Sequence, residues 1–242
     1  MIDDAGVHVI LTSIHNSPLA LFCITFFTTG NFVLFLRFNY LGSTMDCLFG
    51  ISGDGFVVIG ADTSANQSIV RMKTGEDKIC ELDQYKLMGA VGDGGDRVQF
   101  TEFVKANLSL YAFRNGVPLS THAAANYTRG ELATALRKGP YNCNLLVAGI
   151  DDGQPSLYFL DYLATLHKMN CAAHGYCAMF MNSLFDKHWV PGMSVEEVMK
   201  LVDLGIAEVR ARLVVAPPNF LIKIVDKDGV RVLAERKTAT EN

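Results

Sequence analysis

The stretch MDCLFGISGDGFVVIGADTSA, residues 45–65, decides the fold that we expect for this chain of 242 residues. Its two apolar runs have the length of β-strands, and they flank Gly53-Asp54-Gly55, which is a turn signal. The stretch therefore predicts a β-hairpin. Asp62 ends the second run and Lys78 follows sixteen residues later, so a carboxylate and an ammonium group lie just beyond the hairpin in sequence.

Strand and helix patterns alternate after the hairpin. Two short strands are expected within residues 78–91, and the second is apolar enough to be buried on both faces. Two helices are expected next, at residues 97–115 and about 121–138. The first carries an apolar stripe at helical spacing, wide enough to pack on a sheet. The stripe consists of Phe100, Phe103, Val104, Leu108 and Tyr111.

The C-terminal half repeats this order. Strands are expected at residues 144–150, 156–161 and about 164–169, followed by a short helix at about 176–185. Ser194 and Glu197 form a capping box that begins a long helix, which ends near Pro217. A hairpin of residues 220–225 and 230–234 closes the chain. Tight turns between adjacent strands require antiparallel pairing, and each helix covers one sheet face, so the sequence predicts an α+β protein, a four-layer αββα sandwich.

Composition excludes some classes of function. The formal charge is -4, from 21 basic and 25 acidic residues, so there is no basic field to hold nucleic acid. Six cysteines are scattered without a CxxC pair, and no histidine lies at zinc-finger spacing. We therefore expect no metal site, no bound cofactor and no disulfide framework, and we interpret the cysteines as small buried residues in a reducing compartment.

Residues 1–44 differ from the rest of the chain. Leu19 to Leu36 is a run of eighteen residues without a formal charge, long enough to span a bilayer. Polar residues at its centre argue against a spanning helix, and Asp3 and Asp4 argue against a secretory signal. We favour a cleaved propeptide or upstream sequence absent from the mature protein, with Met45 as its start. A membrane anchor and an ordered extension remain open. The expected organisation is thus an extension (1–44), a folded domain (45–237) and a polar tail (238–242).

An ordered set of motifs in residues 45–235 resembles the beta subunits of the 20S proteasome, and within them the non-catalytic type-2 class of the beta-4 position. Besides the hairpin, the motifs are VGDGGD (91–96), RNG (114–116), AAANYTR (123–129), NLLVAG (144–149), DYLA (161–164) and AAHGY (172–176). The resemblance implies the fold of the N-terminal nucleophile hydrolases. In active members, a threonine at the mature N-terminus attacks the peptide bond, with an aspartate and a lysine beside it.

The residues that would carry this chemistry are incomplete. Alignment on Gly55 places Met45 in the threonine position, and a thioether can neither lose a proton nor attack a carbonyl. Asp62 and Lys78 match the family's aspartate and lysine in type and spacing, and we expect them to form an ion pair that orients the hairpin against the third strand. No catalytic residue is therefore predicted.

The resemblance implies a structural role in ATP-dependent, ubiquitin-linked protein degradation, in the cytoplasm and nucleus. The expected partners are other beta subunits in a heptameric ring around the proteolytic chamber, the alpha ring and the opposing beta ring. Neither nucleic acid nor, if residues 1–44 are absent or cleaved, a membrane is expected. The alternative is an active threonine-type endopeptidase whose cleavage exposes Thr44 or Ser43. Cys47 is disfavoured as a nucleophile because no histidine lies near it in sequence.

Overall fold

The computed structural model describes residues 10–11, 23–28, 31–36, 45–67 and 70–237. The chain divides into two compact units, Met1–Leu41 and Gly42–Asn242. In the first unit, the described residues form an antiparallel sheet in the order β1-β2-β3. Its strands are β1 (Ile10–Leu11), β2 (Cys23–Thr28) and β3 (Asn31–Leu36).

The charge-free run from Leu19 to Leu36 is not a continuous helix, because its described part forms β2 and β3. No helix in the described ranges has both the length and the apolar character needed to cross a membrane. Ser43 and Thr44, the two alternative nucleophiles, lie outside the described residues.

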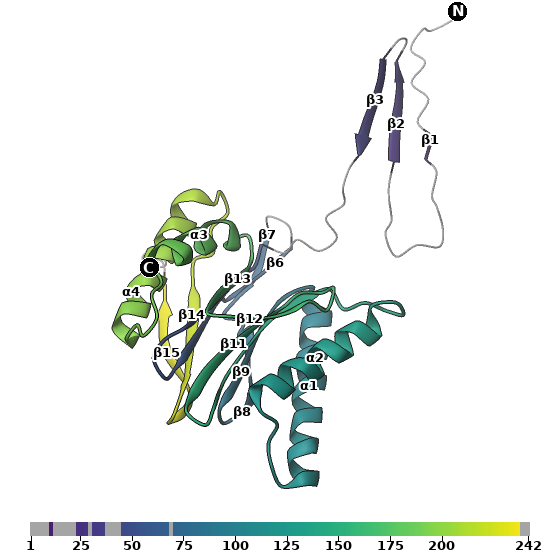
Figure 1. Ribbon diagram of the computed structural model, residues 1–242. Coiled ribbons are helices and arrows are strands. Elements are labelled where there is room, and N and C mark those ends of the chain that lie inside the picture. Colours follow the sequence, from purple (N-terminus) through teal and green to yellow (C-terminus); the bar gives the residue numbers. More distant parts are fainter. Residues whose placement is uncertain (1–9, 12–22, 29–30, 37–44, 68–69, 238–242) are drawn as a thin grey trace, which may run out of the picture. The chain divides into compact units, whose positions relative to one another are not determined.

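The second unit is built on two five-stranded antiparallel sheets (Figure 1). The first has the order β12-β11-β10-β9-β8 and the second β13-β4-β5-β14-β15. The strands of the first are β8 (Ile79–Asp83), β9 (Lys86–Gly92), β10 (Cys143–Asp151), β11 (Gln154–Leu160) and β12 (Leu166–Met169). Those of the second are β4 (Cys47–Ser52), β5 (Val57–Asp62), β13 (Cys171–Gly175), β14 (Phe220–Asp226) and β15 (Gly229–Arg236).

Two helices cover the outer face of each sheet (Figure 1). Helices α1 and α2 pack on the first sheet, and α3 and α4 pack on the second. They are α1 (Gly94–Asn115), α2 (Thr121–Ala135), α3 (Ala178–His188) and α4 (Val195–Arg212). The prediction of a four-layer α+β sandwich is confirmed.

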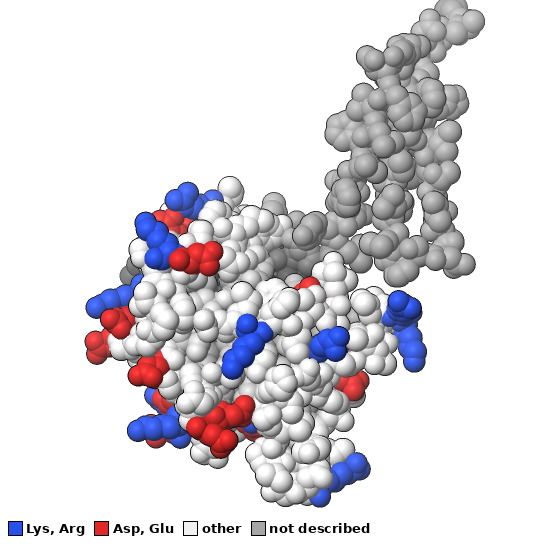
Figure 2. Space-filling view, viewed as in Figure 1, with Lys and Arg blue, Asp and Glu red and all other residues white. Residues whose placement is uncertain are grey.

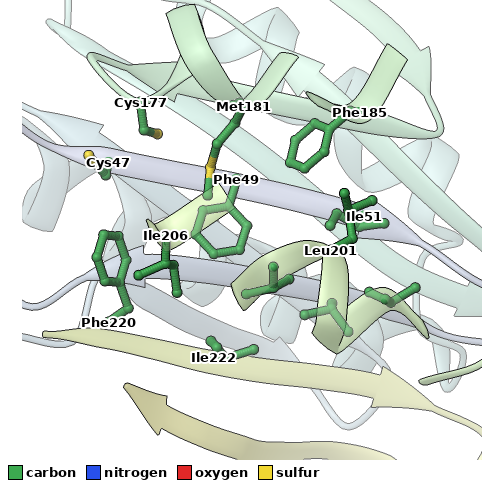
Figure 3. Close-up of a cluster of buried hydrophobic side chains, with 14 of the residues drawn as sticks. Cys47, Phe49, Ile51, Cys177, Met181, Phe185, Leu201, Ile206, Phe220 and Ile222 are labelled. Carbon is green, nitrogen blue, oxygen red and sulfur yellow. The ribbon is translucent and has the colours of Figure 1, made fainter. Parts of the chain in front are cut away.

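Three hydrophobic clusters hold the four layers together. One lies between the two sheets and includes Leu48 of β4, while the other two lie between a sheet and its helix pair. Successive side chains of a strand point to opposite faces. In β4, Leu48 therefore joins the cluster between the sheets, whereas Phe49 and Ile51 join the cluster under α3 and α4 (Figure 3). This strand is buried on both faces.

The structure corrects several predicted boundaries. Helix α1 begins three residues before the expected start at Arg97, because the Asp93 side chain accepts hydrogen bonds from Gly95 N and Asp96 N. The second predicted helix ends at Ala135 and the last at Arg212, ahead of the expected ends. The capping box of Ser194 is confirmed.

Within the second unit, the sequence analysis missed three of the described strands. They are β6 (Ser64–Gln67), β7 (Val70–Thr74) and β13. Strands β6 and β7 pair with each other as a separate two-stranded ribbon, and β7 is exposed along its length. Such a ribbon lacks the apolar run that identifies a buried strand.

The apolar stripe predicted for α1 is wider than the face that the sheet covers. Phe100, Val104 and Leu108 are buried against the sheet as expected. Phe103 and Tyr111, however, are 42% and 43% exposed. Helical spacing identified the apolar side of the helix but not the width of its contact with the sheet.

His174 of β13 links the two sheets. Its ring stacks on Phe159 of β11 with a centroid distance of 4.0 Å, and its Nε2 lies 3.0 Å from the carbonyl oxygen of Leu145 of β10. Burial lowers the pKa of His174 to about 4. Hydrogen bonds to the carbonyl groups of Leu145 and Leu160 raise this pKa, but they oppose the effect of burial only in part. The imidazole is therefore neutral in the folded chain at neutral pH.

We predict that His174 makes the fold sensitive to acid. Its pKa is lower in the folded chain than the ordinary value of about 6.5, so the unfolded chain binds the proton first. The contribution of the neutral imidazole to the unfolding free energy should be fully present above pH 6.5. The unfolding free energy should then fall by up to about 3 kcal/mol as the pH decreases to 4. Urea unfolding at a series of pH values measures this loss.

His174→Phe is the matched variant, because it keeps an aromatic ring but cannot titrate. The wild-type chain should be the more stable one at pH 7.5, and its advantage should shrink toward pH 4.5. A difference in unfolding free energy that stays constant across this range would contradict the assignment.

Candidate functional site

The hairpin and β8 bring three charged side chains together at one end of the sandwich. Asp46 immediately precedes β4, Asp62 is the last residue of β5, and Lys78 immediately precedes β8. The register of the hairpin pairs Leu48 with Ala61, which places the start of β4 beside the end of β5. Because β8 belongs to the other sheet, a contact between these residues joins the two sheets.

The ammonium group of Lys78 is enclosed by oxygen atoms. It lies 2.6 Å from Asp46 Oδ1, 2.9 and 3.0 Å from the two carboxylate oxygens of Asp62, and 2.7 Å from the carbonyl oxygen of Ser64. The side chains of Lys78 and Asp62 are 2% and 0% exposed. An ammonium group has three N–H donors. Two carboxylates and one carbonyl therefore satisfy it completely.

The ion pair expected between Asp62 and Lys78 is present and buried. Asp62 also accepts hydrogen bonds from Cys47 N at 2.8 Å and Ser64 N at 3.1 Å, so it fixes the backbone at the start of β4 and at the start of β6. Burial raises the pKa of Asp62, with the nearby Asp46 carboxylate acting in the same direction and Lys78 opposing both. The cluster holds two acidic groups for one basic group, and Lys78 is the charge that allows both carboxylates to be buried.

Sequence reasoning missed Asp46 as a partner of Lys78. Alignment on Gly55 had placed Met45 at the position of the nucleophile, but the side chain that contacts Lys78 is that of the next residue. Asp46 also accepts a hydrogen bond from Gly92 N at 3.1 Å, so both of its oxygens are occupied. The register of a hairpin is set by its turn, and an alignment anchored on one glycine of that turn is sensitive to a single added residue.

The backbone around Asp46 leaves no space for a side chain at Gly175. Gly175 has a φ of 79°, and a Cβ atom there would lie 2.0 Å from the carbonyl oxygen of Asp46. Tyr176 N donates to the same oxygen at 3.3 Å. Glycine is thus needed at 175 both for its conformation and for the close approach of the two segments.

Cys47 is poorly suited to act as a nucleophile. The side chain is fully buried in the cluster under α3 and α4, where Figure 3 shows it near Cys177. A hydrogen bond with Cys177 and burial both raise the pKa of Cys47. A buried thiol with a raised pKa carries little of the thiolate that attack requires.

Helix α1 is tied to the segment before Lys78 by an ion pair between Arg97 and Glu76. The Arg97 side chain is buried, and Glu76 N donates to the carbonyl oxygen of Thr63 at 2.9 Å. The two charged residues lie 21 positions apart in sequence, and no motif connects them. Only the folded chain reveals this contact.

Comparison with known proteins gives one consistent result. The family model "Proteasome subunit" matches residues 43–225. Proteasome subunit beta type-2-A of Arabidopsis thaliana is 59% identical over 198 residues, which are 81% of this chain and 97% of the relative. Proteasome subunit beta type-2 of Oryza sativa subsp. japonica is 60% identical over 193 residues, 79% of this chain and 91% of the relative. Proteasome subunit beta type-4 of Saccharomyces cerevisiae is 36% identical over 190 residues, which are 77% of this chain and 96% of the relative.

We predict that removing the buried cation strongly destabilises the fold. Lys78→Met leaves the carboxylates of Asp46 and Asp62 buried without a counter-charge, which should cost about 3 to 5 kcal/mol of unfolding free energy. Urea unfolding measures the change. Adding Asp46→Asn and Asp62→Asn to Lys78→Met should restore part of the loss, because the two carboxylate charges are then gone.

The control is Arg212→Met, which breaks the exposed ion pair with Glu208 on α4. This variant should lose less than about 1 kcal/mol, because solvent screens the exposed pair. If Lys78→Met costs no more than Arg212→Met, the cluster does not carry the stability assigned to it.

Proposed function

Because the chain belongs to the proteasome subunit family, we propose that it is a non-catalytic beta subunit of the 20S core particle, of the type-2 class. The observation that carries the proposal is the position of Asp46, whose carboxylate contacts the ammonium group of Lys78 at 2.6 Å. The lysine and aspartate expected for catalysis are kept, but a second carboxylate binds the lysine where a nucleophile would be required.

The chemistry of an N-terminal nucleophile supports this proposal. Such a site needs a hydroxyl group, a free amine that accepts its proton, and a nearby cation that keeps the amine unprotonated. In this chain Lys78 contacts the carboxylates of Asp46 and Asp62 and the carbonyl of Ser64, and none of these groups carries a hydroxyl. A carboxylate can attack some substrates, but both oxygens of Asp46 are engaged by Lys78 and Gly92.

The proposed role is positional. As part of a heptameric beta ring, the chain would form part of the wall around the proteolytic chamber. It would also contact the alpha ring and the opposing beta ring. Its contribution to ATP-dependent, ubiquitin-linked protein degradation would take place in the cytoplasm and nucleus. The names of the relatives, all proteasome beta subunits, support this proposal. Acidic and basic side chains are scattered over the face seen in Figure 2 without a basic field.

We also propose that residues 45–237 form the working domain and that residues 1–44 are cleaved or absent from the mature subunit. The family model begins at residue 43. The plant relatives match 193 and 198 residues of this chain, and these matches already cover 91% and 97% of their own lengths. Little of either relative is left to correspond to residues 1–44.

The N-terminus of the subunit tests the domain proposal. Intact-mass analysis of the chain from the assembled particle should give a mature form that begins at Met45, with or without a blocked amine. The catalytic subunits of the same particle, each with a free N-terminal threonine, are the internal control. A mature chain that begins at Thr44 or Ser43 with a free amine would instead support the endopeptidase alternative.

Covalent labelling tests the absence of catalysis directly. An electrophile directed at N-terminal threonines should modify the catalytic subunits of the assembled particle and leave this chain unmodified, because Lys78 has no nucleophile to assist. The readout is the mass of each subunit after treatment. A covalent adduct on this chain, at saturation comparable with that of a catalytic subunit, would overturn the proposal.

A further inference from the structure

Two buried cysteines lie side by side in the cluster under α3 and α4. Cys47 is the first residue of β4, and Cys177 immediately precedes α3. Both residues are fully buried, and their thiols share a hydrogen bond (Figure 3). The two residues are far apart in sequence, so it is the fold that brings these sulfur atoms together.

The pairing of β13 with β4 holds the two cysteines in place. Gly175, the last residue of β13, lies opposite Cys47 in the register of the two strands. Cys177 follows two residues later, and its thiol donates to the carbonyl oxygens of His174 at 3.3 Å and Leu48 at 3.7 Å. Because Leu48 is the next residue of β4 after Cys47, these contacts keep the Cys177 sulfur beside the start of β4.

The other described cysteines of the second unit are not placed to compete for either thiol. Cys171 pairs with Ile51 at the far end of β13, which is about 13 Å along the strand from Cys47. Cys80 and Cys143 belong to strands of the first sheet. Within this part of the chain, Cys47 and Cys177 are therefore the two cysteines arranged to react with each other.

The start of α3 offers a route by which solvent can reach Cys177. This cysteine occupies the N-cap position of α3 but makes no side-chain capping hydrogen bond, so the first turn of the helix lacks that support. Met179 in this turn is 72% exposed, and opening the turn therefore loses little of its apolar burial. Weakly supported helix ends open locally without unfolding of the whole chain. Cys177 is thus the first of the two thiols that a small reagent reaches.

We propose that Cys47 and Cys177 form a reversible oxidation site, at which hydrogen peroxide converts the two thiols into a disulfide that joins β4 to the start of α3. In the opened turn, the Cys177 thiolate attacks one peroxide oxygen and the O–O bond breaks, which leaves a sulfenic acid and, after protonation, one water. When the turn closes, the Cys47 sulfur attacks the Cys177 sulfur and the S–O bond breaks. The leaving hydroxide takes the Cys47 proton and departs as the second water. The two thiols together lose two electrons, and one peroxide is reduced.

Burial of Cys47 does not prevent the second step. It keeps this thiol from an outside substrate, whereas the sulfenic acid of Cys177 closes directly against it. The disulfide stops oxidation before the irreversible sulfinic and sulfonic acids form. Such an acid would place an unpaired charge in the cluster under α3 and α4, which is costly. The pair therefore protects this cluster, and an exchange with small thiols restores the reduced form.

Peptide mapping of the full-length chain tests the proposal. The reduced chain is treated with a dose of hydrogen peroxide that oxidises added glutathione, its free thiols are blocked with iodoacetamide, and it is digested without reduction. Mass spectrometry should find a peptide pair that joins positions 47 and 177 and is lighter by two hydrogen atoms than the separate peptides. Dithiothreitol should remove this pair. Two unmodified thiols, or a disulfide from either residue to a different cysteine as the main product, would overturn the proposal.

Matched variants test the protective role. In Cys47→Ala, Cys177 has no partner, so peroxide should produce at least about tenfold more sulfinic and sulfonic acid at position 177 than in wild type. Cys143→Ala is the control, because it removes a buried cysteine of the other sheet, and its yield of the disulfide between positions 47 and 177 should equal that of wild type. Equal amounts of these acids at position 177 in wild type and Cys47→Ala would contradict the role.

Urea unfolding shows whether the disulfide belongs to the native fold. The oxidised wild-type chain should have a higher urea midpoint than the reduced chain, because the bond closes a long loop in the unfolded state. Dithiothreitol should return the midpoint to its reduced value. A lower midpoint after oxidation would show that the bond forms only in a distorted chain, and would overturn the proposal. If Cys47→Ala does not fold when reduced, the wild-type peptide map and these midpoints decide the question.

Discussion

The single ammonium group of Lys78, buried where the two sheets meet, is the constraint on which the site depends. A buried cation must be paired and its three N–H groups satisfied, and in this chain Asp46, Asp62 and the Ser64 carbonyl do both. Asp62 alone would leave part of the ammonium unsatisfied and available to another group. Asp46 takes that remaining capacity, so all three N–H groups of the ammonium are bound within the fold.

The same cluster helps to hold the two sheets in a fixed arrangement. Lys78 precedes a strand of the first sheet, while both carboxylates belong to the hairpin of the second. His174 adds a second polar link, from the second sheet to β10 and β11 of the first. Hydrophobic packing between the sheets is non-directional. Hydrogen bonds depend on distance and angle, so these polar contacts form in only one alignment of the two sheets.

Much of the fold could be predicted from the sequence, because its signals are local. The hairpin around Gly53-Asp54-Gly55 and the capping box at Ser194 depend on residues a few positions apart, and both are confirmed. Asp46 could not be found in this way, since its role depends on a lysine 32 positions away and on the register of the hairpin. The exposed side chains of α1 were misassigned for a related reason, because helical periodicity cannot report where a neighbouring sheet ends. The contacts that form the candidate site are long-range.

Because β4 is buried on both faces, a shift in the register of this strand is disfavoured during folding. If β4 slipped by one residue along β5, Leu48 and Phe49 would exchange faces and two separate clusters would be mispacked at once. The slip would also turn the Asp46 carboxylate away from its cation and press a different backbone atom against Gly175. Three penalties therefore oppose this one displacement, and the contact of Asp46 with Lys78 forms only when β4 is in its correct register.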